Sequence, residues 1–491
     1  MSYFDLAPGR STSGVDTPGS SVFDLPTQSQ RTNNDQPSPS SAAPELVVGR
    51  QQAVESLYSS ESESPSFIVI SGGTGCNSIC PAFGNACYVL PVSDDGGSSS
   101  EIIRVIGGPS IGDIRSRLVR LIPPAPTDSP LDRIRNLLAY RLPAKCTERE
   151  ARDEWRDIVE GRSALWTGIP NDRKETIRGF LVHFENEVLR RAHKSFSFLN
   201  GSIGNYFLSG AQDFFRSLPS AIFLFSSITN SQANIVPVIV TNHTVTIAAE
   251  LENGARLVGQ CEISHPVRSG DGLSITLSGE EPMSPQDDLG DTIRRPSNVL
   301  FESSGKDEYE PLGSKITRLY YINAYGSEIH PSPNTDYLNN MSSKDVLVYS
   351  CGSLWTSIVP CLALRGVAGS IARSRSLRAK VLLLNSQNDR ETDGYTALDY
   401  IDTIARTLNA TYTASYSGLR DAYTTYPVSA FITHLVYLEG TNIEIDTSMI
   451  TAKGVKCVKV QGPRDEKSGI PKFDATGIRK AIIDILSHEQ E

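Results

Sequence analysis

Two short apolar runs, each closed by a turn, constrain the fold of this 491-residue chain more than any other feature. Phe67–Ile70 reads FIVI and is followed by Gly72-Gly73, and Tyr88–Val92 repeats the pattern about twenty residues later. Continuous apolar runs of this length are typical of strands buried on both faces of a parallel sheet. The spacing is that of a β-α-β unit, so we predict an α/β fold in three layers, with a Rossmann-like, doubly wound and mostly parallel sheet. Such sheets bind their ligands at the carboxyl ends of the strands.

The chain divides into a tail and one large domain. Residues 1–64 are rich in Ser, Thr, Pro and Gln, and their apolar residues are isolated. Such a segment buries too little surface to offset the entropy of ordering, so we predict a disordered Ser/Pro-rich tail. Residues 65–491 form the predicted α/β domain. Within it we expect a helical insert at 122–200 and a polar, flexible excursion at 266–314.

A hairpin interrupts the α/β pattern. Residues Val236–Ile263 contain alternating apolar and polar positions on both sides of Asn253-Gly254, which is the strongest short hairpin signal. The α/β pattern then resumes, with predicted strands at Ile316–Ile322, Val346–Tyr349, Val381–Leu384 and His434–Tyr437. Predicted helices are Ser110–Leu121 (opened by a Ser110/Asp113 capping box), Ile203–Leu218, Asp399–Leu408 and Ile478–Leu486.

Composition narrows the class of partner. A formal net charge of −10 argues against nucleic acid, which calls for a basic face. No apolar run approaches the ~18 residues of a membrane span, and no secretory leader is evident, so we expect a cytoplasmic protein without a membrane partner. The eight cysteines contain no CxxC pair, which favours buried free thiols in a reducing compartment.

The first candidate motif is the glycine turn Gly72–Gly75. Glycines after a buried strand let backbone amides approach phosphate, and we predict phosphate contacts from Gly72, Gly73, Thr74, Gly75 and Asn77. Gly73-x-Gly75-x-x-Ser78 is nearly the dinucleotide fingerprint, with Ser in the third glycine slot. An ordinary strand-to-helix turn explains the glycines almost as well. No Walker lysine follows, which argues against a P-loop NTPase.

The second motif is Asp94-Asp95-Gly96-Gly97, which follows the second apolar run. Asp94 stands about where a Rossmann acidic residue holds ribose hydroxyls. Adjacent carboxylates followed by small hydroxyl residues also suit Mg²⁺ bridging to phosphate. Solvated loop carboxylates are the plainer alternative. We predict Asp94 and Asp95 as the catalytic residues and as ligands of Mg²⁺.

Three further segments supply candidate binding residues. Asp113 either caps a helix or shapes the cleft, and Arg115 either clamps an anion or lies on a solvated helix face. Asn205 opens a later helix. The segment Gly352–Ser357 repeats the strand–glycine–helix pattern, so we predict a second anion site formed by Gly352, Ser353, Thr356 and Ser357, whose hydroxyls are otherwise ordinary N-caps.

Six motifs in order resemble one family. They are GGTG (Gly72–Gly75), VSDDGGSSS (Val92–Ser100), GDIR (Gly112–Arg115), IGN (Ile203–Asn205), GSLWTS (Gly352–Ser357) and NDRETDGYTALDYI (Asn388–Ile401). The chain resembles the CofD/YvcK family, which contains 2-phospho-L-lactate transferases and the bacterial gluconeogenesis factor. The resemblance implies that an aspartate in the position of Asp94 or Asp95 holds Mg²⁺ and phosphate near a guanosine ligand. Cys351 replaces the proline usual in the family.

The resemblance leads to one functional prediction and several alternatives. Segments around the hairpin look like the gluconeogenesis-factor branch, which implies a partner that is a nucleotide or nucleotide sugar and a role in carbon or cell-envelope metabolism. The alternative is a Mg²⁺-dependent transferase of a phosphorus-containing group, similar to 2-phospho-L-lactate transferase. A non-catalytic sensor is a further alternative. An NAD-dependent oxidoreductase is supported only by the near-match to the dinucleotide fingerprint at Gly73–Ser78. A homodimer is compatible with the sequence, which does not name the base, the acceptor or the oligomer.

Overall fold

The computed structural model describes residues 64–265, 310–410 and 425–488. The predicted tail at 1–64 therefore lies almost entirely outside the described residues, as does most of the predicted excursion at 266–314. All eight cysteines are described, and none of them forms a disulfide.

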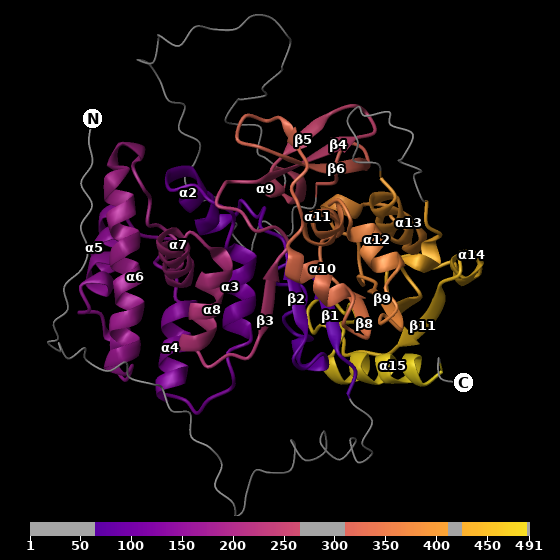
Figure 1. Ribbon diagram of the computed structural model, residues 1–491, viewed down its shortest axis with the longest axis horizontal. Helices are drawn as coiled ribbons and strands as arrows, with labels where there is room; N and C mark the ends of the chain where they lie inside the picture. The colour runs from indigo at the N-terminus through magenta and orange to yellow at the C-terminus, as the bar shows by residue number, and fades with distance from the viewer. Residues whose placement is uncertain (1–63, 266–309, 411–424, 489–491) are drawn as a thin grey trace, which may run out of the picture. The chain divides into compact units, whose positions relative to one another are not determined.

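A seven-stranded parallel sheet forms the centre of the domain, as predicted (Figure 1). Each strand pairs in parallel with its neighbours. Its order is β11-β10-β9-β8-β1-β2-β3. The strands are β1 (Phe67–Ile70), β2 (Cys87–Leu90), β3 (Asn234–Pro237), β8 (Val346–Tyr349), β9 (Ala379–Leu383), β10 (His434–Leu438) and β11 (Lys456–Val460).

The strand order reverses between β1 and β8. From β1 the chain moves outward through β2 to β3, and from β8 it moves the other way through β9 and β10 to β11. Such a reversal is a topological switch point, where the loops leaving neighbouring strands diverge and a ligand site forms. The Gly72–Gly75 turn follows β1 and the Gly352–Ser357 segment follows β8, so both predicted anion turns lie at this point.

Helices flank the sheet to give the predicted three layers (Figure 1). Polar caps define several helix starts, for example the reciprocal capping box of Thr147 and Glu150 that opens α5. The α-helices are α2 (Gly97–Val105), α3 (Gly112–Arg120), α4 (Pro130–Ala139), α5 (Glu148–Val159), α6 (Asn171–Arg190), α7 (Ile203–Phe215), α8 (Leu218–Ile228), α9 (Gln260–Ser264), α10 (Thr335–Met341), α11 (Val359–Leu362), α12 (Val367–Ala372), α13 (Ala397–Leu408), α14 (Thr447–Ala452) and α15 (Ala475–Ser487).

The predicted hairpin belongs to a second, antiparallel sheet. Strands β4 (Thr246–Leu251) and β5 (Arg256–Val258) pair across Asn253-Gly254, as predicted. Strand β6 (Ile316–Ile322) was predicted to continue the α/β pattern, and that placement is wrong. It pairs antiparallel with β4, and β7 (Glu328–Ile329) completes the sheet in the order β5-β4-β6-β7. An apolar run does not reveal which of two sheets it joins.

Two details of local structure also differ from the predictions. Helix α3 begins at Gly112 with Ile111 as N-cap and no side-chain cap, so the predicted Ser110/Asp113 capping box is wrong. The Ser110 hydroxyl instead accepts a hydrogen bond from the Gly112 amide at 3.4 Å. Between β1 and β2 the chain forms turns and a short 3₁₀ helix, Cys80–Ala82, in place of the α-helix of the predicted β-α-β unit, and Pro81 lies in the first turn of this short helix.

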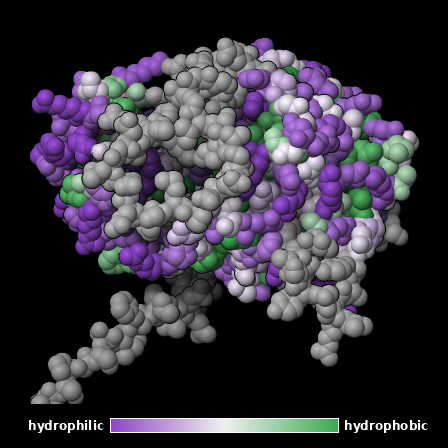
Figure 2. All heavy atoms as spheres, turned by 90° about the horizontal axis from the view of Figure 1, so that it is seen from above, coloured by the Kyte–Doolittle hydropathy of each residue, from purple (hydrophilic) through white to green (hydrophobic). Residues whose placement is uncertain are grey.

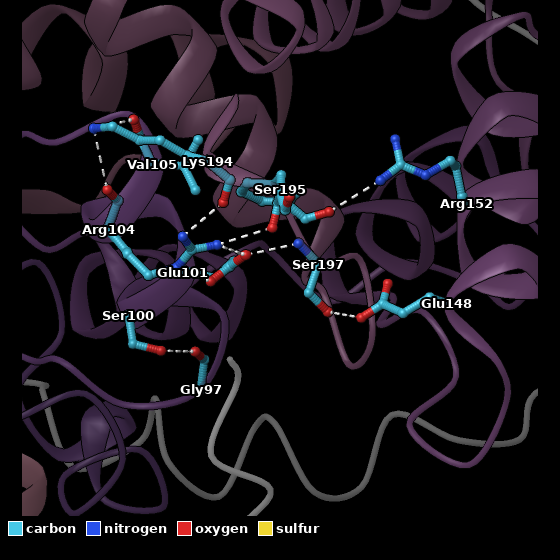
Figure 3. A network of polar contacts seen from close by, with 11 residues as sticks. Gly97, Ser100, Glu101, Arg104, Val105, Glu148, Arg152, Lys194, Ser195 and Ser197 are labelled. Atoms are coloured by element: carbon cyan, nitrogen blue, oxygen red, sulfur yellow. Dashed lines mark hydrogen bonds and ion pairs between the residues drawn. The ribbon is translucent and has the colours of Figure 1, made fainter. Parts of the chain in front are cut away.

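Helices α4, α5 and α6 lie in the segment 122–200 that was predicted as a helical insert, and a buried carboxylate ties this segment to helix α2 (Figure 3). Glu101 on α2 accepts hydrogen bonds from the Arg104 guanidinium at 2.6 and 2.8 Å and from the Ser197 amide at 2.6 Å. Arg104 in turn donates to the Lys194 carbonyl at 2.7 Å. Because α2 directly follows the Asp94-Asp95 turn, this network fixes that turn relative to the insert.

One face of the molecule is mostly polar. Apart from the grey atoms, the face seen in Figure 2 is mainly hydrophilic, with small scattered hydrophobic areas. Within the described ranges, none of the helices combines the length and apolar character needed to cross a bilayer.

Replacing Glu101 should loosen the insert. Glu101→Ala leaves the buried Ser197 amide without its acceptor, so we expect the free energy of unfolding to fall by about 1–3 kcal/mol. Glu175→Ala is the matched control, because it removes an exposed Glu–Arg pair with the same helical spacing and should cost about 0.5 kcal/mol or less. Urea unfolding of both variants checks this. Equal losses for the two variants would contradict a structural role of Glu101.

Candidate functional site

The two predicted anion turns touch each other at the switch point. A Cβ atom built on Gly75 would lie 2.6 Å from the Cys351 carbonyl oxygen and 3.0 Å from the Gly352 Cα. A Cβ on Gly72 would overlap the Ser357 side chain. Only glycine permits this approach of the two backbones, so the glycines of the first motif serve packing between the turns as well as any ligand.

The first turn is anchored through its carbonyl groups. The Ser116 hydroxyl donates to the Gly73 carbonyl at 2.9 Å, and the Arg117 guanidinium donates to the Gly72 carbonyl at 2.9 Å. Thr74 and Gly75 are exposed. No α-helix starts at this turn, because the short 3₁₀ helix comes only at Cys80. The predicted helix N-terminus behind Gly72–Gly75 is therefore wrong, and the helix end facing the turn is that of α3.

Asn77 has a structural contact on the same side. Its side-chain amide donates to the Ser116 hydroxyl at 3.4 Å, and its side-chain oxygen is buried without a protein partner. A ligand contact from Asn77 stays a prediction.

The second turn already holds a carboxyl group, which the protein itself supplies and whose pKa burial raises to about 8. The buried Glu391 carboxylate accepts hydrogen bonds from the Trp355 amide at 3.0 Å, the Thr356 amide at 3.1 Å and the Thr356 hydroxyl at 2.5 Å. These residues open a π-helical turn, Leu354–Ile358, that leads into α11. The predicted vacant anion site at this helix N-terminus is therefore wrong for Thr356, since Glu391 satisfies its donors.

Gly352 is also paired internally. Its φ of +138° lies in the range that favours glycine, its amide donates to the Asn385 side-chain oxygen at 2.9 Å, and its carbonyl accepts from the Asn385 amide at 2.8 Å. The Ser353 hydroxyl hydrogen-bonds with Asp389. Ser357, half-buried against Gly72, is the hydroxyl of this turn that faces the first motif.

The acidic turn brings Asp94 to the start of helix α3. One Asp94 oxygen accepts from the Gly96 amide at 3.1 Å, and the other lies against Gly112. Asp113, on the first turn of α3, packs against Gly73 and accepts from its amide. Burial and the neighbouring Asp113 raise the pKa of Asp94 to about 8, and burial raises the pKa of Asp113 to about 6. Two half-buried carboxylates thus converge beside the first turn.

Asp95 points to a different partner. Its carboxylate accepts from the Cys261 amide at 2.8 Å and lies against Gly259, whose φ is +92°. Burial raises its pKa, and the hydrogen bond from Cys261 opposes the shift. Asp95 therefore connects the acidic turn to helix α9 and to the hairpin sheet.

Positive charge lies next to these carboxylates. The Arg115 Nε donates to the Asn205 side-chain oxygen at 3.2 Å, and the Asn205 amide donates to the Ser98 hydroxyl at 2.8 Å. Burial and nearby Arg141 lower the pKa of Arg115 to about 10, while Asp94 opposes that shift. Asn205 is almost fully buried, so it positions Arg115 rather than facing a ligand.

Sequence reasoning missed several residues of this site. Arg141 follows α4 in the insert, and its position next to Asp94 and Arg115 had no sequence signal. Glu391 lies inside the motif Asn388–Ile401, and Asn385 lies just before it. That motif supported only the family resemblance. The reciprocal cap of Asp389 and Thr392 was readable as a cap signal, although it does not reveal what Glu391 binds.

The described surface also has a depression away from the site. It lies between the end of α8 and the start of β3, and its lining includes Phe223, Asn230 and Ile235. None of the predicted site residues lines it.

The arrangement suits a cation and an anion held side by side. Carboxylate oxygens are the ligands that Mg²⁺ prefers, and Asp94 and Asp113 would lose their protons on binding it. A guanidinium is suited to phosphate or carboxylate. The donor set of Asp94, Asp113 and Arg115 therefore fits a Mg²⁺–phosphate pair, whereas Asp95 is already used in part by α9.

These features define a Rossmann-like α/β protein with a polar site at its topological switch point. Residues 67–488 match the family described as "2-phospho-L-lactate transferase CofD", and the chain belongs to this family. The family resemblance predicted from the motifs is thus confirmed.

Known relatives agree with this assignment. "Uncharacterized protein YNL011C" of Saccharomyces cerevisiae is 36% identical over 431 residues, which cover 80% of this chain and 94% of the yeast protein. The gluconeogenesis factor of Halalkalibacterium halodurans is 21% identical over 341 residues, covering 69% of this chain and 72% of the relative. A crystal structure of a UPF0052 family protein from Bacillus halodurans superposes with a TM-score of 0.53 at 18% identity, covering 85% of this chain and 99% of the other, and it shows the shared fold.

Separating the two turns should destabilise the domain. In Gly75→Ala the new methyl group meets backbone atoms of Cys351 and Gly352, so we expect a loss of about 1–3 kcal/mol in unfolding free energy. Gly179→Ala, inside α6 with open space around it, is the control and should stabilise by about 0.5–1 kcal/mol. Chemical denaturation measures both. A neutral Gly75→Ala would show that the turns do not depend on this contact.

The carboxylate of Asp94 should make stability depend on pH. The pKa of Asp94 is about 8 in the folded state and 3.8 ordinarily. Between these values the folded state holds a proton that the unfolded state releases. The free energy of unfolding therefore falls as the pH rises from 3.8 through 8. Asp94→Asn cannot ionise, so its stability relative to wild type should increase from pH 5 to pH 8.5. Urea unfolding in EDTA measures this, with exposed Asp484→Asn as control. A pH-independent difference would contradict the raised pKa.

Proposed function

We propose that the chain binds a nucleotide or nucleotide sugar together with Mg²⁺ at the switch point of its parallel sheet. The observation that carries this proposal is the convergence of Asp94 and Asp113, both with raised pKa, beside the Arg115 guanidinium. Two neighbouring carboxylates in a half-buried position favour a bound cation. A cation and an arginine together suit the diphosphate of a nucleotide.

Each residue has a distinct proposed role. Asp94 and Asp113 would hold Mg²⁺, which when bound neutralises the phosphate charge. Asp95 is the further candidate ligand, and it would have to leave the Cys261 amide to serve. Arg115, oriented by Asn205, would contact phosphate oxygens, while exposed Thr74 and Gly75 and half-buried Ser357 line the glycine side of the site.

The biological role proposed for this binding is that of the gluconeogenesis-factor relatives, in carbon or cell-envelope metabolism. Its support is the similarity to the Halalkalibacterium halodurans protein of that name over 69% of this chain. We further propose a cytoplasmic location, on the ground that all eight cysteines are free thiols.

A second candidate function is transfer of a phosphorus-containing group. The family name and the carboxylate pair favour it, because a metal held by carboxylates stabilises charge developing on phosphate. In that case Asp94 and Arg115 would position the nucleotide-activated donor, and catalysis would come from positioning and charge neutralisation.

Thermal unfolding of the full chain tests the binding proposal. GDP, GTP and UDP-sugars with Mg²⁺ are added in turn, and a ligand at a hundred times its Kd should stabilise by about 2.7 kcal/mol. We expect a shift in Tm that EDTA reduces, that Asp113→Asn diminishes and that the exposed control Asp484→Asn retains. Absence of a shift with every nucleotide would refute the proposal.

The same samples separate binding from turnover. Phosphorus NMR of the stabilising nucleotide, incubated with Mg²⁺ and candidate acceptors, should show a new resonance if a group is transferred. A stabilising ligand that stays chemically unchanged favours the binding function over the transferase.

A further inference from the structure

Arg117 is a fully buried guanidinium, and within the described residues no carboxylate lies in an ion pair with it. Its nitrogens donate to Cys80 Sγ at 2.5 Å, Ser71 Oγ at 3.1 Å and the Gly72 carbonyl at 2.9 Å. The guanidinium carbon lies 4.9 Å from the centroid of the Tyr88 ring. One guanidinium atom, Nε, is buried without a hydrogen-bond partner.

A buried positive charge requires a nearby negative one, because its desolvation is costly. Asp113, one turn earlier on α3, feels the charge of Arg117 but does not contact it. Of the groups that Arg117 does contact, Tyr88, Cys80 and Cys76 are the ones able to ionise. Burial holds the pKa of Tyr88 far above its usual range, and the hydrogen bond with Cys80 together with burial raises the pKa of Cys76, which leaves Cys80 as the counter-ion.

A second thiol assists Cys80. Cys76 lies four residues earlier in the same turn, and its side chain hydrogen-bonds to that of Cys80. This hydrogen bond and the charge of Arg117 lower the pKa of Cys80 to about 6, against the opposing effect of burial. Cys87, equally enclosed on β2, has no such partners, and burial raises its pKa to about 12. Thiol environments therefore differ sharply within one core.

We propose that Cys80 is the thiolate counter-ion of Arg117 and forms, with Cys76, a peroxide-sensitive dithiol site beneath the glycine turn. The Cys80 thiolate attacks one oxygen of hydrogen peroxide, the O–O bond breaks, and Cys80 becomes a sulfenic acid with release of hydroxide. The Cys76 thiol then attacks Cys80 Sγ, and a disulfide forms with loss of water. Both cysteines are oxidised by one peroxide molecule, which is reduced to hydroxide and water.

The site has a direct structural consequence for the turn above it. Arg117 bonds the thiolate on one side and the Gly72 carbonyl on the other. Oxidation removes the negative charge of Cys80 and leaves the guanidinium buried without compensation. The anchor of the glycine turn is thereby weakened, independently of any ligand.

Peptide mapping of the full chain tests the site. The reduced protein is treated with hydrogen peroxide, the remaining thiols are alkylated, and peptides are identified by mass spectrometry. We expect a Cys76–Cys80 disulfide to form several-fold faster than any oxidation of Cys87 or Cys361, which are at least as buried. In Cys76→Ser we expect dimedone to label Cys80. Oxidation of Cys80 no faster than that of Cys87 overturns the proposal.

Thermal unfolding of three variants tests the counter-ion separately. Cys80→Ser removes the anion, Cys80→Asp keeps a negative charge next to Arg117, and Cys87→Ser is the matched buried control. We expect the Tm of Cys80→Ser to fall further than that of Cys87→Ser, and Cys80→Asp to restore part of the loss. If Cys80→Ser does not fold, the peroxide experiment on wild type still decides. Equal Tm values for Cys80→Ser and Cys87→Ser would overturn the ion pair.

Discussion

The pairing of β1 with β8 is the contact on which the site depends. The two strands run in parallel register from Phe67 opposite Val346 to Ile70 opposite Tyr349. Just before them, the Ser66 amide and hydroxyl donate to the Asp345 carboxylate at 2.8 and 2.7 Å, across 279 residues of chain. This pairing creates the reversal of strand order, and it brings the loops after β1 and β8 together. Without it the glycine turn would face only β2.

Hydrogen bonding then decides which parts of the site are complete. Glu391 fills the helix start after β8, and Arg117 anchors the turn after β1. Asp94, Asp113 and Arg115 differ from them, since each side chain has a single hydrogen-bond partner within the described part of the chain. The protein thus satisfies the groups that shape the loops and leaves three ionisable groups with few partners together at one place. Such a distribution is typical of a ligand-binding site.

The sequence predicted the inner strands of the parallel sheet, because buried runs such as Val346–Tyr349 are short, apolar and followed by a turn, but it missed the edge strands β3 and β11. It placed Ile316–Ile322 in the wrong sheet, since its pairing with β4 depends on contacts between distant segments. It also located the acidic turn and the glycine turn correctly at the strand ends. The sequence could not show that Glu391 accepts the hydrogen bonds of Thr356. The two residues are 35 positions apart, and no local sequence pattern links a carboxylate to a helix start at that separation. Arg141 was missed for the same reason.

The contact of Asp95 with helix α9 has a thermodynamic consequence. The carboxylate oxygen that caps the Cys261 amide is a strong candidate for any cation that enters beside Asp94. Because the same oxygen does not serve fully in both places, recruitment of Asp95 by a metal opposes docking of α9 and of the hairpin sheet behind it. Linkage makes this competition reciprocal. Any interaction that stabilises docking of the hairpin sheet would therefore weaken metal binding by the same factor. Through Asp95, docking of the small sheet and any cation bound at the acidic turn would therefore compete for one carboxylate.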